Sequence, residues 1–224
     1  MQENNGRTHR AGRRAAAVTI KGYELKPTLI VIDTQNGFVS DGGSYDKLGI
    51  NRSHYKKALP NIIRLVNICR KIGTPIVFTI AVREPSGVDL LTKTHKILPL
   101  PREERIEEIP ICIKGTWDAD IVAELKPDNK EYVITKRRDS AFYGTKLEDL
   151  LRKLQVDSVI FCGFDTSMCV ETSLRDAFNL GFDVMVVSDA TASMNPKRYE
   201  CTLDDVRSFY GLVVDTNELA TELS

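Results

Sequence analysis

The sequence alternates short apolar blocks with longer amphipathic stretches, and this alternation constrains the fold more than any other feature. The apolar blocks are rich in β-branched residues and end at turn residues, which is typical of strands. Strands are predicted at residues 28–33, 75–82, 131–135, 158–162, 182–188 and 212–215. Their hydrophobicity is continuous rather than alternating, which indicates strands that are covered on both faces.

Helical periodicity fills the intervals between these blocks. Helices are predicted at residues 55–71, 118–124, 146–154, 168–180 and 197–210. Thr145 and Glu148 have the spacing of a capping box at the third helix, and Gly181 follows the fourth, where a helix end favours a positive φ. Because parallel strands need crossover connections, this order predicts one doubly wound α/β domain with helices on both faces of a parallel sheet.

Composition restricts the class of protein further. A chain of 224 residues that is 42% hydrophobic can bury a core as a single domain. No apolar run approaches the roughly 18 residues of a membrane span, so no membrane role is expected. The five cysteines include no CxxC pair, which excludes zinc-ligand spacing and thioredoxin-type chemistry; they are Cys69, Cys112, Cys162, Cys169 and Cys201. Free thiols are typical of the cytosol, so a cytoplasmic location is expected.

The net charge of zero conceals two oppositely charged parts. Residues 1–27 hold six basic and two acidic side chains, whereas residues 28–224 hold 25 basic and 29 acidic ones. We therefore predict a solvated basic N-terminal extension over 1–27, followed by a mildly acidic domain over 28–224. The acidic domain offers no basic face for a nucleic acid, and the Arg-rich head lacks the apolar region of a signal peptide. A nucleic-acid or targeting arm remains the alternative for the head.

Three reactive side chains lie at or after the carboxyl ends of predicted strands, where ligands bind in open α/β sheets. Asp33 ends the first strand, Lys136 follows the third, and Cys169 begins a helix beyond the fourth, with Thr166 or Ser167 as its cap. A helix N-terminus and a neighbouring ammonium both stabilise a thiolate, and a carboxylate can act as a base. A structural role explains each residue singly, but their convergence favours a nucleophilic site. Neither nearby loop carries GxGxxG or a P-loop lysine, so a dinucleotide oxidoreductase is not expected.

Three segments together resemble the isochorismatase-like cysteine hydrolases, in order and spacing from about residue 28 to the C-terminus. They read LIVIDTQNGF at 29–38, VITKRRDSAFYGTKLEDLL at 133–151 and VIFCGFDTSMCVETSLRDAFNLGFDVMVVSDATAS at 159–193. The resemblance implies a three-layer α/β/α sandwich with a six-stranded parallel sheet and Rossmann-like topology, in agreement with the fold derived above. It assigns residues 28–224 to one hydrolase domain.

The family's catalytic triad corresponds to Asp33, Lys136 and Cys169. The resemblance implies that Cys169 attacks an amide carbonyl, that Asp33 passes the thiol proton to the leaving ammonia, and that water hydrolyses the thioester. It also implies an oxyanion hole made by the backbone N–H groups of Asp165 and Cys169, with a cis peptide between Phe164 and Asp165. Asp165 departs from the small residue usual at its position. Because a carboxylate near the thiol would raise the thiol pKa, the Asp165 side chain is expected to point away from Cys169.

No metal and no cofactor are expected. Nicotinamidases of this family carry a DxH motif and a second histidine after the second strand. Here that stretch reads FTIAVREPSGVDLL, and the histidines of the chain are His9, His54 and His95. Isochorismatases proper, which cleave a vinyl ether, lack the nucleophilic cysteine, so Cys169 favours amide chemistry.

Further runs are similar to the branch that hydrolyses ureidoacrylate, N-carbamoylsarcosine and biuret: GGSYDKLG at 42–49, ICIKGTWDADIVAEL at 111–125, and Arg138 after the lysine. Residues 83–130 are expected to supply a crossover and a cover over the site, because such long connections are usually functional. The candidate substrate contacts are Gln35, Phe38, Arg83, Trp117, Arg138, Tyr143 and Phe164. For Arg83, Trp117, Arg138 and Tyr143, a surface salt bridge or aromatic packing is the alternative.

The sequence therefore predicts a metal-independent cysteine amidohydrolase that cleaves a linear C–N bond of a small amide, ureido or carbamoyl compound and releases ammonia. Relatives are commonly dimers or tetramers, so a homo-oligomer is expected, and neither a nucleic acid nor a membrane is an expected partner. Two alternatives stay open. One is a catalytically silent relative that binds a small molecule or a protein, suggested by Asp165 beside the nucleophile, and the other is a nicotinamidase-like amidase.

Overall fold

A six-stranded parallel sheet forms the centre of the protein, whose computed structural model describes residues 17–108 and 110–223. Its strand order is β5-β4-β3-β6-β7-β8. The strands are β3 (Pro27–Ile32), β4 (Ile76–Ala81), β5 (Tyr132–Lys136), β6 (Ser158–Phe164), β7 (Asp183–Ala192) and β8 (Gly211–Val214). All six predicted strands are present, which confirms the α/β fold class, and β7 continues beyond its predicted end at residue 188.

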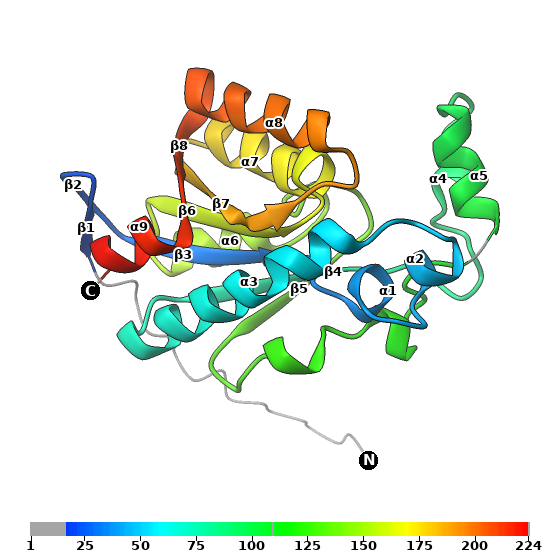
Figure 1. Ribbon diagram of the computed structural model, residues 1–224, viewed down its shortest axis with the longest axis horizontal. Helices are drawn as coiled ribbons and strands as arrows, with labels where there is room; N and C mark the ends of the chain where they lie inside the picture. The colour runs from blue at the N-terminus through cyan, green and yellow to red at the C-terminus, as the bar shows by residue number, and fades with distance from the viewer. Residues whose placement is uncertain (1–16, 109, 224) are drawn as a thin grey trace, which may run out of the picture.

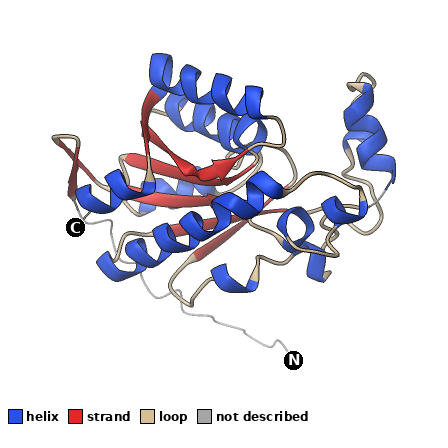
Figure 2. Cartoon of the chain, viewed as in Figure 1, coloured by secondary structure: helices blue, strands red, loops and turns tan. Residues whose placement is uncertain are grey.

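Helices cover both faces of the sheet and make the three layers visible in Figures 1 and 2. In β3, Leu29 and Val31 pack into the core under α3 and α9, while Ile30 and Ile32 pack into the core under α6, α7 and α8. This two-sided burial explains the continuous hydrophobicity of the strands. The helices are α1 (Asn36–Val39), α2 (Ser44–Lys47), α3 (Ser53–Ile72), α4 (Leu91–Thr94), α5 (Leu100–Glu108), α6 (Leu147–Lys153), α7 (Glu171–Asn179), α8 (Pro196–Asp205) and α9 (Thr216–Glu222). Within the described ranges, no helix combines the length and hydropathy that crossing a bilayer requires.

Two local predictions are wrong. The stretch predicted as a helix over 118–124 forms two 3₁₀ turns, η1 (Trp117–Ala119) and η2 (Ala123–Leu125). Its backbone instead pairs with the loop after β3, since Val122 N–H donates to the carbonyl of Thr34. The capping box of Thr145 and Glu148 is also absent: the N-cap of α6 is Lys146, and the Thr145 hydroxyl accepts from Leu147 N–H. Gly181, by contrast, has the expected positive φ of 83°.

A small antiparallel hairpin precedes the sheet. It consists of β1 (Val18–Ile20) and β2 (Tyr23–Leu25) and lies beside α9 in Figure 1. Ile20 is fully buried in the same core as α3, and Lys21 N–H donates to Glu222 Oε2 at 2.9 Å. The last part of the segment expected to be a solvated extension therefore packs on the fold. Residues 1–16, which hold the four arginines of that segment, lie outside the described residues.

The connection from β4 to β5 divides into two parts. The two 3₁₀ turns pack under the loop after β3, whereas α4 and α5 project away from the sheet (Figure 1). Ion pairs anchor the projecting part: Arg137 lies 2.7 Å from Asp89, and Arg102 lies 2.7 Å from Asp139. Of the expected cover, the two 3₁₀ turns therefore lie against the loop at the carboxyl end of β3, whereas α4 and α5 form an arm held by these ion pairs.

Candidate active site

The three predicted reactive side chains meet at the carboxyl edge of the sheet. Lys136 Nζ lies 2.7 Å from Asp33 Oδ2 and 3.2 Å from Cys169 Sγ. The side chains of Lys136 and Asp33 are 1% and 2% exposed. Asp33 directly follows β3, Lys136 ends β5, and Cys169 lies after β6, so parallel strands bring distant residues to one point. The lysine is the bridge between the carboxylate and the sulfur.

Thr79 holds Asp33 from the neighbouring strand β4. Its hydroxyl donates to Asp33 Oδ1 at 2.6 Å, and the backbone N–H of Asp33 lies 3.2 Å from the same hydroxyl oxygen. Asp33 has a φ of 50°, a left-handed conformation that aspartate tolerates better than most residues. Thr79 was not predicted as a site residue, although it is a polar residue in the otherwise apolar strand IVFTIA.

The Lys136 side chain stays positively charged in the site. Its ammonium forms an ion pair with Asp33 and donates hydrogen bonds to Cys169 Sγ at 3.2 Å and to the carbonyl of Arg138 at 3.1 Å. Burial alone would lower the pKa of Lys136, but the Asp33 carboxylate and the Cys169 sulfur hold it above its usual value. The positive charge therefore persists at neutral pH.

The Cys169 thiol is protonated in the resting site. Burial raises the pKa of Cys169 to about 12, although the neighbouring Lys136 ammonium works in the opposite direction. The sequence led us to expect a stabilised thiolate, and the desolvation of the sulfur outweighs that effect. Cys169 as a residue is nonetheless partly exposed, so a substrate can reach it. Its proton must leave as the sulfur attacks, which requires a base in the site.

A sharp turn joins β6 to the nucleophile. It contains the cis peptide between Phe164 and Asp165 and continues into a π-helical turn, η3 (Thr166–Val170), that leads into α7. The predicted caps Thr166 and Ser167 are wrong, because the N-cap is Asp165, whose carboxylate accepts from Ser167 N–H.

The backbone amides of this turn have an unusual arrangement. Met168 N–H and Val170 N–H both donate to the Asp165 carbonyl, at 3.2 and 3.1 Å, while the amide of Cys169 between them does not. Among the described residues, the Asp165 N–H has no hydrogen-bond partner. These two amides are the predicted oxyanion donors.

Gly163 allows this turn to form. Its φ is +104°, and a Cβ atom there would lie 2.1 Å from the carbonyl oxygen of Ile32. The end of β6 therefore approaches β3 more closely than any residue with a side chain could, which fixes where the turn begins.

Two predicted substrate contacts have structural roles instead. Gln35 is fully buried, and its amide bonds to both backbone groups of Ala81 and to the carbonyl of Ala119, so it clamps β4 to the turn η1. Phe164 is 1% exposed and stacks on Tyr55, with ring centroids 4.5 Å apart. Neither side chain has a free surface for a ligand.

The remaining candidate substrate contacts are arginines that donate hydrogen bonds to neighbouring loops and aromatic side chains that are exposed or partly buried. Arg138 donates to the carbonyl of Asp89 and to Thr94, and Arg83 donates to the carbonyl of Val82. Arg138 and Tyr143 line a cavity of about 250 Å³. Trp117 and Tyr143 are exposed, and Phe38 is partly buried against Tyr45.

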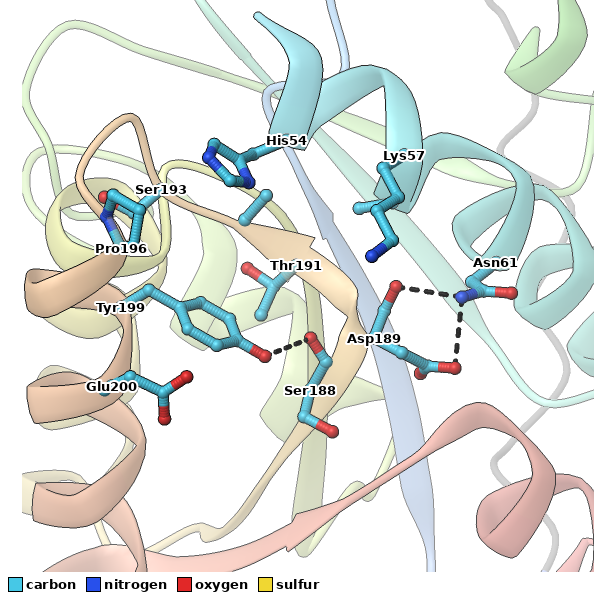
Figure 3. Close-up of a pocket in the computed structure, with 12 residues that line it drawn as sticks. His54, Lys57, Asn61, Ser188, Asp189, Thr191, Ser193, Pro196, Tyr199 and Glu200 are labelled. Carbon is cyan, nitrogen blue, oxygen red and sulfur yellow. Dashed lines mark hydrogen bonds between the residues drawn. The ribbon is translucent and has the colours of Figure 1, made fainter.

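A larger cavity, of about 350 Å³, lies beside the nucleophile turn. Figure 3 shows it between α3, which contributes His54 and Lys57, and α8, which contributes Tyr199, with the end of β7 as its floor. No triad residue lines it. Ser193, on its wall, contacts the turn through its hydroxyl, which lies 3.0 Å from that of Ser167.

Across residues 17–108 and 110–223, no group of three or more His, Cys, Asp or Glu side chains is arranged to hold a metal ion. The absence of a metal from the working protein stays a prediction.

The isochorismatase domain model matches residues 27–218. This chain belongs to the isochorismatase family. Similar curated members are the ureidoacrylate amidohydrolase RutB of Agrobacterium fabrum, 29% identical over 94% of this chain and 95% of that protein, and RutB of Yersinia enterocolitica, 32% identical over 84% of each. An isochorismatase family protein from Desulfovibrio vulgaris has a similar structure, with a TM-score of 0.73 and 29% identity over 88% of this chain and 97% of the other. The N-carbamoylsarcosine amidase of Thermoplasma acidophilum gives a TM-score of 0.65 at 25% identity, over 85% and 96% of the two chains.

Proposed function

We propose that this isochorismatase-family protein is a cysteine amidohydrolase that cleaves a linear C–N bond of a small amide, ureido or carbamoyl compound and releases ammonia. One observation carries the proposal: the Lys136 ammonium bridges Asp33 and Cys169 at 2.7 and 3.2 Å, with the side chains of Lys136 and Asp33 almost fully buried. A nucleophile, a carboxylate and a fixed cation at these distances make a site for covalent catalysis.

In the proposed acylation, Cys169 Sγ attacks the substrate carbonyl carbon while its proton passes to Asp33. The oxyanion of the tetrahedral intermediate accepts hydrogen bonds from the amides of Asp165 and Cys169. Asp33 then gives the proton to the leaving nitrogen, the C–N bond breaks, and ammonia departs from a thioester. Lys136 stays charged throughout, because its pKa is raised, and it stabilises the thiolate as it forms.

Water completes the cycle. Asp33, again a carboxylate, accepts a proton from a water molecule that attacks the thioester. As the C–S bond breaks, Asp33 passes this proton to the sulfur, which returns the Cys169 thiol and releases a carboxylic or carbamic acid. Asp33 is also needed as a base in the first step. The pKa of Cys169 is high before it reacts, and a neutral thiol is a weak nucleophile.

The predicted enzyme class, a hydrolase of carbon–nitrogen bonds other than peptide bonds, is confirmed by the curated relatives, which are amidohydrolases. For the substrate, we propose a ureido compound with a carboxylate, the class to which the RutB relatives' ureidoacrylate belongs. The homo-oligomer remains a prediction, which light scattering on the purified chain would test.

The test measures ammonia release from ureidoacrylate, N-carbamoylsarcosine, biuret and nicotinamide. The wild type is expected to hydrolyse at least one of the first three, and Cys169→Ala to lose that activity by at least about a thousandfold, as for removal of a covalent nucleophile. Cys201→Ala, which removes an exposed thiol, is the matched control and should retain full activity. Activity that survives in Cys169→Ala would contradict the mechanism. Hydrolysis of nicotinamide alone would favour the nicotinamidase-like alternative, and an inert wild type would favour the silent one.

A further inference from the structure

The carboxylate of Asp165 is buried and fully engaged. Asp165 is 7% exposed, and its Oδ2 accepts from the Tyr55 hydroxyl at 2.8 Å and from Met194 N–H at 2.9 Å. Its Oδ1 accepts from both the backbone N–H and the hydroxyl of Ser167, each at 2.8 Å. A carboxylate offers about four lone-pair sites, and four donors fill them.

These four donors come from three different parts of the fold. Tyr55 is on α3, Met194 is in the loop between β7 and α8, and Ser167 belongs to the turn itself. None of these hydrogen bonds joins the Asp165 carboxylate to Cys169. Asp165 therefore ties the turn that precedes the nucleophile to two elements on either side of the larger cavity.

Tyr55 holds both residues of the Phe164–Asp165 pair. Its ring stacks on Phe164 with centroids 4.5 Å apart and an interplanar angle of 21°, while its hydroxyl donates to Asp165. Tyr55 is itself 1% exposed, so the ring has little freedom to move. The peptide bond between Phe164 and Asp165 thus lies between two side chains that are held in place. Its N–H, that of Asp165, has no hydrogen-bond partner among the described residues.

The Tyr55 hydroxyl stays protonated at neutral pH. Burial and the nearby Asp165 carboxylate raise the pKa of Tyr55 well above its usual value. A protonated hydroxyl can only donate to a carboxylate, so the direction of the bond is set. The Tyr55 hydroxyl is therefore a fixed hydrogen-bond donor to Asp165.

We propose that Asp165 and Tyr55 are positioning residues for oxyanion stabilisation: they hold the amides of Asp165 and Cys169 where the oxyanion forms. This inference rests on the proposed amidase function and goes beyond it, since neither side chain touches the reacting atoms. A donor that is misplaced by a fraction of an ångström stabilises the transition state less without weakening the binding of the ground state.

Tyr55→Phe in the full chain tests the role of the hydroxyl, because the ring and its stacking on Phe164 are kept. We expect kcat to fall about tenfold while KM changes less than about twofold. Affinity for an aldehyde analogue of the substrate, whose thiohemiacetal oxygen uses the same amides, should fall by a similar factor. Affinity for the unreactive product should not change.

Tyr199→Phe is the matched control. It also removes a hydroxyl near the cavity, but that hydroxyl donates to the carbonyl of Ser188 and not to the turn (Figure 3). Its kcat should stay within about twofold of the wild type. Asp165→Asn is the second variant: an amide NH₂ facing donors cannot accept their bonds, so its loss in kcat should exceed that of Tyr55→Phe, with KM again nearly unchanged.

The inference is overturned if Tyr55→Phe and Asp165→Asn both keep wild-type kcat and aldehyde affinity, or if their defect lies in KM alone. This failure is distinct from failure of the proposed function, because the wild type would still release ammonia in a Cys169-dependent way. A wild type without such activity would overturn both.

Discussion

Removal of the Lys136 ammonium is expected to destabilise the protein much more than removal of a surface charge. Lys136 and Asp33 are 1% and 2% exposed and 2.7 Å apart, so Lys136→Met leaves a carboxylate without a counter-ion in a buried site. Deleting one partner of a buried pair costs about 3–5 kcal/mol. Because the stranded carboxylate can take up a proton, the cost near pH 7 is limited to about 4 kcal/mol, the free energy of protonating an aspartic acid about three units above its ordinary pKa.

The pH dependence of this loss has a definite sign. In Lys136→Met the folded state holds a proton on Asp33 that the unfolded state releases, so its free energy of unfolding falls as the pH rises, by about 1.4 kcal/mol per unit. The deficit relative to the wild type is therefore about 4 kcal/mol near pH 7 and about 1.5 kcal/mol near pH 5.

Urea unfolding followed by far-ultraviolet circular dichroism measures both quantities. Circular dichroism is the better probe, because the single tryptophan, Trp117, is already 53% exposed in the folded protein. Lys146→Met is a control from an exposed pair with Asp149 and should cost less than about 0.5 kcal/mol. The double variant Asp33→Asn/Lys136→Met has neither charge and should show no extra pH slope. Equal deficits at both pH values, or a Lys136→Met variant as stable as Lys146→Met, would refute the reasoning.

Three further outcomes are expected. Gly163→Ala should lower the free energy of unfolding by more than about 2 kcal/mol in thermal unfolding, because the new Cβ would meet the Ile32 carbonyl oxygen at 2.1 Å. Gly181→Ala, whose Cβ would have nothing within 4 Å, should lower it by about 1 kcal/mol. Equal losses in the two variants would contradict the steric explanation. Thr79→Val should reduce kcat about tenfold or more by removing a hydrogen bond to Asp33, whereas Thr28→Val, which removes a bond to the Pro75 carbonyl in the same sheet, should leave kcat unchanged. Alkylation of free Cys169 by iodoacetamide, followed by mass spectrometry, should be slow at neutral pH and accelerate about tenfold per pH unit toward its pKa of about 12; a rate that levels off below about pH 9 would show that the thiolate is stabilised after all.

The sequence was sufficient for the sheet and for the meeting of the three reactive side chains. Strands covered on both faces carry continuous apolar blocks, and parallel strands place their carboxyl ends together, so the meeting of Asp33 and Lys136 follows from the order of the strands and the place of each residue in its strand. Cys169 could be added because a helical pattern begins directly after β6.

Residues that act through another element could not be predicted. Thr79 and Tyr55 belong to β4 and α3, and only the folded chain shows that their hydroxyls reach Asp33 and Asp165. The position of Gln35 after the first strand suggests a ligand contact. Its side chain instead bonds to the backbone carbonyls of Ala81 and Ala119, and no local sequence pattern predicts these contacts.

The N-terminal hairpin was missed for a different reason. Its strands have three residues each, with charged and polar residues between the apolar ones, and the basic charge of the region favoured a solvated extension. The two buried side chains Ile20 and Leu25 are too few to produce a periodic signal.

The contact between this hairpin and α9 has a consequence for how the protein is made. Lys21 and Glu222 are separated by 201 residues, and β3, at the centre of the sheet, pairs with β6, which begins more than a hundred residues later. During synthesis β3 can pair with β4 soon after both are made, but its other edge stays unpaired until β6 has emerged. The contacts of the hairpin with α9 form only after residues 216–222 have been made, so nascent chains stalled before α9 will expose Ile20 to chaperones and proteases.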